Sequence, residues 1–253
     1  LEIKKINFSN YGYKKYKING EIFNKKFKAN LKNNNKNLDF RILNTGIKAN
    51  FKLNEKNLKN TASGSSKISI LDNYFKLNFN LNNNQVEIIN SSFRNKNLSI
   101  FFNSLIQFNP FFEISSDINI EEIDKQLINN ISLEKILKNK KVIKKLNSNN
   151  RVNYKAKKFG NKLIENLTFE SNLAYGRLNF LNEIIVAGGV INCKGDSVLI
   201  EEYPRLNFDC IFKIKDKKKI FRKFSISKKF DKNPINLNIK GSFNIFNKKI
   251  NFK

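Results

Sequence analysis

The acidic side chains are the first to consider for chemistry, because the sequence contains no His. Without His the chain lacks the commonest general base and the usual metal ligand. Acidic residues cluster at Glu121, Glu122 and Asp124 and again at Glu201 and Glu202. Adjacent carboxylates at a helix start or in a turn are usually solvated, so they do not indicate a paired acid and base. The sequence also has no phosphate-binding glycine loop, CxxC pair or calcium loop. We therefore expect no catalysis, no metal and no cofactor.

The two cysteines, Cys193 and Cys210, are the other residues with possible chemistry. Cys193 is in phase with Ile191, and Cys210 is in phase with Phe208 and Phe212, so both should lie on apolar strand faces. Two small buried apolar side chains are one interpretation. A disulfide is the other, and it requires adjacent strands with close Cβ atoms. The sequence leaves both interpretations open.

Apolar and polar residues alternate through most of the chain, and this period of two predicts strands. The pair Asn19-Gly20, between two such runs, predicts a hairpin turn. Further turns are expected from Asn44 to Gly46 and from Thr61 to Ser66. We expect a mainly β fold with a large, antiparallel, strongly curved sheet that is either groove-like or an open sandwich.

The stretch from Asn119 to Leu146 departs from this alternation. Its later apolar residues, among them Leu137 and Ile143, are three or four apart with lysines between them, which predicts an amphipathic helix. The first residue is a candidate cap, with Glu121 and Glu122 in the first turn. We favour a helix whose apolar stripe closes one end of the sheet. The alternative is a basic amphipathic helix on an anionic membrane, for which this stretch lacks the expected aromatic residues.

These patterns divide the chain into a β-meander over 1–118, a helical interval over 119–147 and a second β-meander over 148–253. The last part contains a short basic helix at about 216–224. We expect one continuous structural unit with this one principal helical interval. Because the sequence contains no Met, we also expect it to be a fragment of a longer protein.

The formal net charge of +27 suggests a polyanionic partner. The lysines are spread along the whole chain, however, and arginine, which reads bases and phosphates through two hydrogen bonds, is scarce. We therefore expect attraction to anionic membrane surfaces and no specific nucleic acid partner. No apolar run approaches the ~20 residues that a membrane-spanning helix needs, so this part should lie outside the bilayer core.

Three segments resemble the middle of bacterial AsmA-like proteins: Tyr16 to Gly20, Asp39 to Gly46 continuing to Phe51, and Asp117 to Asp124. Later features follow the order of that family's C-terminal region: Gly188-Gly189, Gly195-Asp196, Pro204 to Phe208, Asp216 to Phe224 and a closing hairpin. The resemblance implies a periplasmic protein that is tethered to the inner membrane by an N-terminal helix outside this sequence. It also implies repeated antiparallel strands that form a long hydrophobic groove, and a role in outer-membrane assembly or phospholipid transport. Other envelope proteins are possible partners.

An antiparallel sheet with one apolar face must cover that face with another layer or leave it accessible as a groove. The sequence does not decide between these two arrangements. The candidate groove residues come from the alternating runs: Phe51, Leu53, Phe75, Leu77, Phe79, Leu81, Phe169, Tyr175, Phe180, Phe208, Cys210 and Phe212. We expect a non-enzymatic envelope protein that binds or conducts phospholipid acyl chains along an apolar β-groove, or assists outer-membrane assembly. The alternative function is a basic β protein that binds polyanions or nucleic acid.

Overall fold

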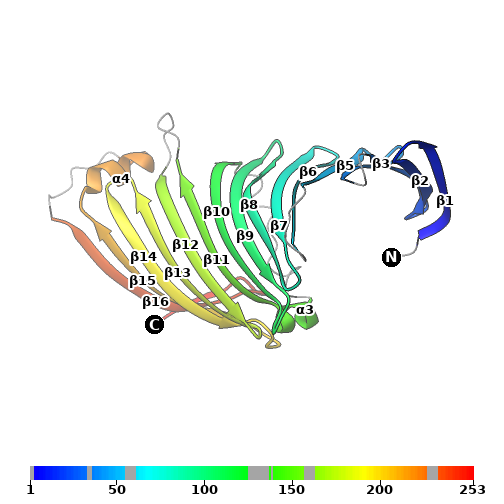
Figure 1. The fold of residues 1–253 in the computed structure, drawn as a ribbon. Coiled ribbons are helices and arrows are strands. Elements are labelled where there is room, and N and C mark those ends of the chain that lie inside the picture. The colour runs from blue at the N-terminus through cyan, green and yellow to red at the C-terminus, as the bar shows by residue number, and fades with distance from the viewer. Residues whose placement is uncertain are drawn as a thin grey trace. The chain divides into compact units, whose positions relative to one another are not determined.

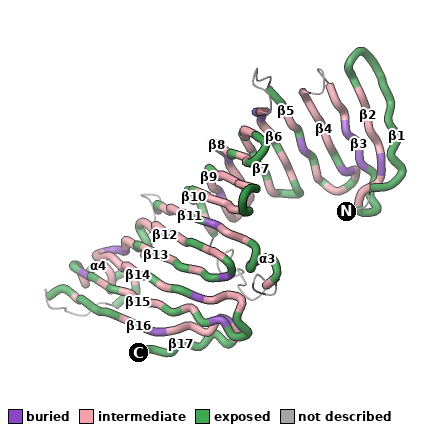
Figure 2. Tube along the Cα trace, turned by 60° about the horizontal axis from the view of Figure 1, so that its bottom comes forward, coloured by how far each residue is buried: buried purple, intermediate pink, exposed green. Residues whose placement is uncertain are grey.

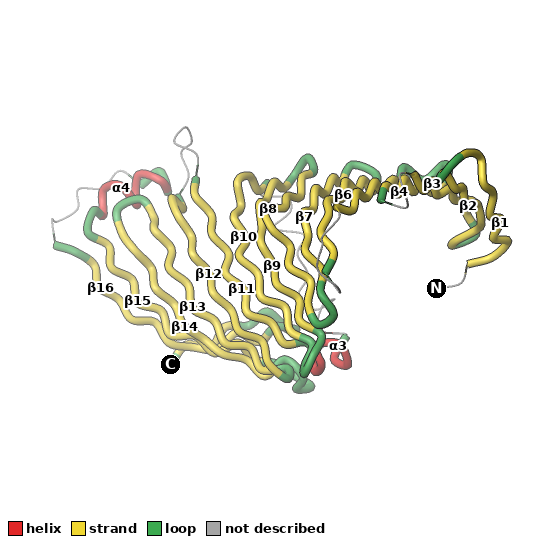
Figure 3. The backbone as a smooth tube through the Cα atoms, viewed as in Figure 1, coloured by secondary structure: helices red, strands yellow, loops and turns green. Residues whose placement is uncertain are grey.

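The computed structural model describes residues 3–32, 36–54, 61–124, 137, 139–156, 163–226 and 233–253. Strands make up 70% of the structure, which confirms the predicted mainly β fold. Within the described part the chain forms 17 strands and two helices, and the strands belong to one open, mostly antiparallel sheet. Figure 3 shows the described helices as short segments between strands.

The chain divides into two compact units, residues 1–105 and 106–253. Unit 1 contains eight complete strands and most of a ninth. They are β1 (Ile3–Gly12), β2 (Lys15–Ile22), β3 (Lys25–Lys32), β4 (Asn37–Ile42), β5 (Ile47–Asn54), β6 (Ala62–Ile70), β7 (Asn73–Leu81), β8 (Gln85–Arg94) and β9 (Leu98–Gln107). From β1 to β8, each strand pairs antiparallel with the next strand in the sequence.

Unit 2 contains the remaining strands and both described helices. The strands are β10 (Glu113–Ile123), β11 (Asn147–Lys155), β12 (Ile164–Ala174), β13 (Arg177–Val186), β14 (Gly189–Val198), β15 (Arg205–Ile214), β16 (Ile235–Asn244) and β17 (Ile250–Phe252). The helices are α3 (Lys140–Lys145) and α4 (Lys217–Lys223). Figure 1 shows β10 to β16 side by side in a curved sheet, with α3 and α4 at opposite ends of the strands.

One pair of strands in unit 2 is parallel. β10 and β11 run in the same direction, from Glu113 opposite Asn147 to Ile120 opposite Tyr154. From β11 to β17, all neighbouring strands are antiparallel. A parallel pair needs a crossover connection, and α3 lies within that connection.

The prediction that a helix begins at Asn119 was wrong, because β10 continues to Ile123. Glu121 and Glu122 therefore lie in a strand and not in the first turn of a helix. Tertiary pairing explains the difference: β10 keeps its period of two while it pairs with β11. Residues 125–136 and 138 of the predicted helical interval lie outside the described residues.

Two of the predicted turns are also wrong. β2 runs through Asn19-Gly20, and the turn follows it at Phe23 and Asn24, whose φ angles of 51° and 57° suit a hairpin turn. β6 begins at Ala62, so most of the stretch from Thr61 to Ser66 is strand. The third prediction is confirmed, since the residues from Asn44 to Gly46 lie between β4 and β5.

Buried residues are few, and Figure 2 shows them as short stretches separated by half-buried and exposed positions. In unit 1 a cluster forms around Phe27, Ala29 and Ile42 on neighbouring strands. In unit 2 a cluster forms at one end of the sheet around Leu137, Ile143 and Ile245. Ile143 belongs to α3, which agrees with the favoured interpretation of a helix that closes one end of a sheet.

Candidate functional site

The register of unit 1 places most apolar strand residues on one face, because residues directly opposite each other in a ladder project from the same face. We call this the apolar face of unit 1. Its members include Ile18, Phe27, Ala29, Leu31, Leu38, Phe40, Ile42, Ile47, Ala49, Phe51, Leu53, Ile68, Phe75, Leu77, Phe79, Leu81 and Ile88.

In unit 2 most apolar strand residues also lie on one face of the sheet. We call the corresponding surface the apolar face of unit 2. Its members include Ile114, Ile118, Ile120, Val152, Tyr154, Leu167, Phe169, Leu173, Leu178, Phe180, Ile184, Ile191, Cys193, Leu206, Phe208, Cys210, Phe212, Ile214, Leu237, Ile239, Phe243, Ile250 and Phe252.

The structure places the predicted groove residues on these two faces, with one exception. Tyr175 lies in the turn after β12, with φ of 50° and 60% of its surface exposed, so it belongs to neither face. Unit 1 holds Phe51, Leu53, Phe75, Leu77, Phe79 and Leu81, and unit 2 holds Phe169, Phe180, Phe208, Cys210 and Phe212. The sequence-based list missed Phe27, Leu237 and Phe252, although the period of two around them was a usable signal.

Aromatic rings lie across glycine residues on both apolar faces. Phe79 is directly opposite Gly64, and a Cβ added to this glycine would lie 2.9 Å from the ring. The absence of a side chain therefore lets the ring approach the backbone of the neighbouring strand. The pairs with this arrangement are Gly20 with Phe27, Gly64 with Phe79, Gly195 with Phe180 and Gly241 with Phe208.

Neither apolar face has a covering layer within its own unit, as far as the described residues extend. The element pairs with extensive contacts there are neighbouring strands of the sheet. Side chains such as Leu53, Leu237 and Phe252 consequently keep exposed fractions of 40%, 48% and 69%. A sandwich that covers itself would bury such residues. One end of unit 2 is closed, because Leu137 and Ile143 pack there against partly buried side chains of the apolar face.

The opposite faces are polar, and their side chains interact across the strands. In unit 2, Arg151 forms an ion pair with Glu170 at 2.7 Å. On the same face, the Asn207 amide donates to the Asp196 carboxylate at 3.0 Å. These groups are largely exposed, so this face is suited to contact with water.

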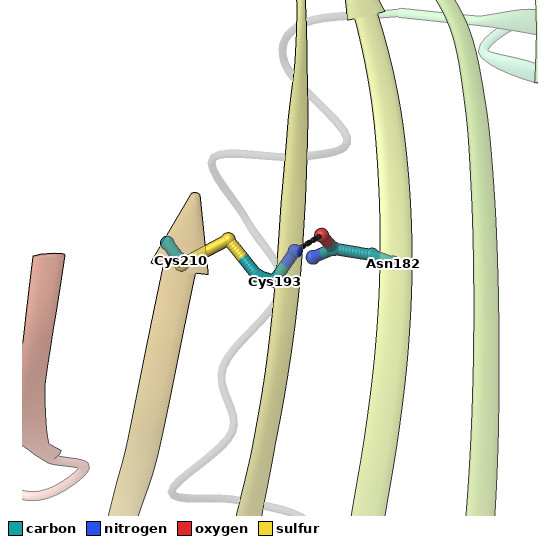
Figure 4. The surroundings of a disulfide bond; sticks show 3 residues. All are labelled: Asn182, Cys193 and Cys210. Atoms are coloured by element: carbon teal, nitrogen blue, oxygen red, sulfur yellow. Dashed lines mark hydrogen bonds between the residues drawn. A yellow bond between two sulfur atoms is a disulfide. The ribbon is translucent and has the colours of Figure 1, made fainter. Parts of the chain in front are cut away.

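The two cysteines form a disulfide between β14 and β15 (Figure 4). Cys193 and Cys210 are directly opposite each other on the apolar face of unit 2, with their Cα atoms 4.1 Å apart. The side-chain oxygen of Asn182 accepts a hydrogen bond from the backbone N–H of Cys193 at 3.1 Å. The sequence left two interpretations open, and the structure agrees with the one in which the two cysteines form a disulfide.

The polar face of unit 1 carries a cationic row made of Lys28, Arg41 and Lys48. Lys28 lies directly opposite Arg41, which in turn lies directly opposite Lys48. None of the three forms an ion pair with another described residue. Like charges directly opposite each other destabilise a sheet, so this row favours a bound anion. This local concentration of charge was not apparent from the dispersed lysines of the sequence.

The acidic clusters lie apart and do not form a pocket. Glu121 and Glu122 are exposed on β10, and Glu201 and Glu202 are exposed in the connection between β14 and β15. Among the described residues, no group of three or more His, Cys, Asp or Glu side chains could hold a metal ion.

Comparisons with protein-family models, with curated proteins and with solved structures find no match for this chain. The AsmA-like resemblance therefore stays a prediction from the sequence. Among the described helices, none combines the length and apolar character that crossing a membrane requires.

Proposed function

We propose that this chain is a non-enzymatic envelope protein that binds phospholipid along its apolar sheet faces and conducts it between membranes, or assists outer-membrane assembly. The observation that carries the proposal is the apolar face of each unit, over which the described residues form no second layer. Large contiguous apolar surfaces usually mark binding sites, because leaving them in water is costly. Lipid tails fit these faces because they need apolar contact and no fixed polar partner.

The expected strength of binding follows from the chemistry of the acyl chain. Each buried methylene contributes ~0.8 kcal/mol, so a tail of ordinary length on rows of Phe, Ile and Leu would be held firmly. Headgroup specificity should be low, because the contacts are non-directional. Exposed lysines at strand ends, such as Lys248 and Lys249 before β17, can attract phosphate headgroups while their stems contact apolar surface.

A periplasmic location is part of the proposal. The Cys193–Cys210 disulfide supports it, because disulfides persist in oxidising compartments and are rare in the cytosol. The AsmA-like resemblance implies the same compartment and an inner-membrane tether outside this sequence.

The test is the retention of a photo-crosslinkable phospholipid, supplied as a monomer, by the protein and its variants. We expect Phe79→Asp on β7 and Phe208→Asp on β15 to lower crosslinking several-fold, because a charge on an apolar face opposes acyl-chain burial. Matched controls are Tyr74→Asp on β7 and Ile211→Asp on β15, which place the same charge on the opposite face. Both control positions are exposed, at 57% and 43%.

Circular dichroism and thermal unfolding of each variant separate loss of binding from loss of fold. Because Phe79 and Phe208 also pack over glycines, Leu237→Asp provides an independent variant at a site that is 48% exposed. Equal crosslinking in the apolar-face and control variants, or none in the unaltered protein, would contradict lipid binding at these faces.

Polyanion binding is a second candidate function, and the cationic row of unit 1 favours it. We expect such binding to be non-specific and to fall steeply with salt, because phosphate contacts release counterions. Lys28→Gln combined with Lys48→Gln should weaken binding of duplex DNA and reduce its salt dependence. A control with Lys194→Gln and Lys213→Gln removes two exposed lysines from the polar face of unit 2. Sequence-selective binding of DNA at physiological salt would contradict this candidate function, because the cationic row provides no specific contacts to base edges.

A further inference from the structure

We infer that one end of unit 2 binds the surface of an anionic phospholipid membrane. The binding surface, which we call the basic-aromatic tip, combines α3 with the segment that precedes β10. It consists of Phe108, Phe111, Phe112, Lys141, Val142, Lys144 and Lys145. This surface is separate from the two apolar faces, so the inference goes beyond the proposed function and stands without it.

The exposed side of α3 is both basic and apolar. Ile143 is only 5% exposed and anchors the helix to the end of the sheet, whereas its neighbour Val142 is 62% exposed. Lys141 precedes this valine, Lys144 and Lys145 follow one residue further on, and all three lysines are exposed. Long lysine stems beside an exposed apolar side chain are suited to the boundary between headgroups and acyl chains.

The aromatic residues that a membrane-binding surface needs come from a different segment of the chain. Phe111 and Phe112 are 62% and 42% exposed, and the ring centroids of Phe108 and Phe112 are 6.3 Å apart. Phe112 and the α3 residues line a depression of about 470 Å³. The sequence of the helical interval alone could not show this combination, because Phe112 is separated from α3 along the chain.

The charges that line the depression are lysines and favour an anionic partner, whereas the nearest carboxylates lie outside its lining. Exposed Glu201 and Glu202 lie in the neighbouring connection, where Lys140 donates to the backbone carbonyl of Glu201 at 2.8 Å. The Glu113 carboxylate accepts a hydrogen bond from Asn149 at 2.6 Å. The lysines that line the depression form no ion pair with another described residue. Exposed phenylalanines next to a depression lined with lysines match an anionic bilayer surface better than a nucleic acid, which has no apolar layer to receive them.

Tryptophan fluorescence can test insertion directly, because the sequence contains no Trp. Phe111→Trp would supply a single reporter at the tip, and Leu181→Trp would supply a matched reporter at a 56% exposed site on the polar face of unit 2. We expect vesicles of phosphatidylcholine and phosphatidylglycerol to shift the emission of the tip reporter to shorter wavelength, and lipids with brominated chains to quench it. The reporter at position 181 should respond to neither.

Lysine and phenylalanine variants separate the two contributions to binding. Lys141→Gln with Lys144→Gln should weaken sedimentation with phosphatidylglycerol-containing vesicles by about 25-fold, since each lysine near an anionic surface contributes about fivefold. The charge-matched control is Lys194→Gln with Lys213→Gln. Phe111→Ser with Phe112→Ser should weaken binding at any salt concentration, and Leu181→Ser with Ile211→Ser is its control.

The inference is supported if the control variants bind vesicles as strongly as the unaltered protein does and the tip variants bind them more weakly. Equal losses in tip and control variants, or no vesicle binding by the unaltered protein, would overturn it. Capture of an acidic protein without any vesicle response would also overturn it. Vesicle binding reports on the tip, whereas crosslinking of a monomeric phospholipid reports on the apolar faces, so failure of the tip and failure of the lipid-binding face are distinguishable.

Discussion

The two faces of the sheet in unit 2 are built from the same strands but are suited to different surroundings. On β15, Phe208 and Phe212 project to the apolar face, while Asp209 and Ile211 project to the other. On the polar face, Asp209 forms an ion pair with Lys240 at 3.2 Å. On the apolar face, rings pack over glycines and a disulfide joins two strands.

Neither face has a second layer over it within unit 2, as far as the described residues show. Water can satisfy the polar face, because its groups are charged or hydrogen-bonding. Water cannot satisfy the apolar face, so an apolar partner lowers its free energy. The alternation of the strands therefore provides one face suited to water and one face that, in the proposed function, contacts lipid.

The largest effect on stability should come from the covalent link on the apolar face. Replacing both cysteines, Cys193→Ser and Cys210→Ser, should lower the free energy of unfolding by about 3 kcal/mol, because the disulfide closes a loop with a sequence separation of 17. Urea unfolding of the two proteins under oxidising conditions measures the difference. Addition of a reductant to the unaltered protein should lower the free energy of unfolding by a similar amount. If the reductant does not change it, the disulfide does not stabilise the fold.

A smaller effect should follow from filling one glycine beneath an aromatic ring. Gly64→Ala should destabilise unit 1 by roughly 1–3 kcal/mol, since the new Cβ would lie against the backbone carbonyl oxygen of Lys52 and 2.9 Å from the Phe79 ring. Ser65→Ala, on the opposite face of the same strand, is the control for urea unfolding. The combination of Gly64→Ala with Phe79→Leu should recover part of the loss. Additive losses would show that the ring and the glycine are not coupled.

The smallest effect should come from the polar face. Arg151→Ala removes an ion pair whose side chains are 58% and 44% exposed, so it should change the free energy of unfolding by less than about 1 kcal/mol. Urea unfolding measures this change as well. A change as large as that of the cysteine variant would mean that the polar face is packed against a partner and not solvated.

The sequence predicted which face of the sheet a strand residue lies on better than it predicted where the turns lie. The alternation from Leu206 to Ile214 places Phe208, Cys210 and Phe212 on one face, and the register confirms this. The period of two is enough to predict the face, because successive side chains alternate between the two faces whichever way the strand runs. Pairing of the two cysteines could not be predicted, since it depends on which strands are neighbours.

The failures share a physical cause, which is contact between distant residues. Gly20 is locally typical of a turn glycine, but it is needed within β2 beneath the ring of Phe27. Likewise, Gly64 and Ser66 are buried on the apolar face, although they belong to a stretch that is locally typical of a polar turn. Local propensity gives no sign of such cross-strand contacts.

The central claim is that lipid chains contact one face of the sheet and not the other. A photo-reactive amino acid placed at Phe212 or at Ile211 tests it, because these adjacent residues of β15 project to opposite faces. The chain would be produced in bacterial cells, irradiated there, and its adducts identified by mass spectrometry. We predict phospholipid adducts at position 212 and few or none at position 211. Equal lipid adducts at both positions, or only protein adducts at position 212, would contradict the claim.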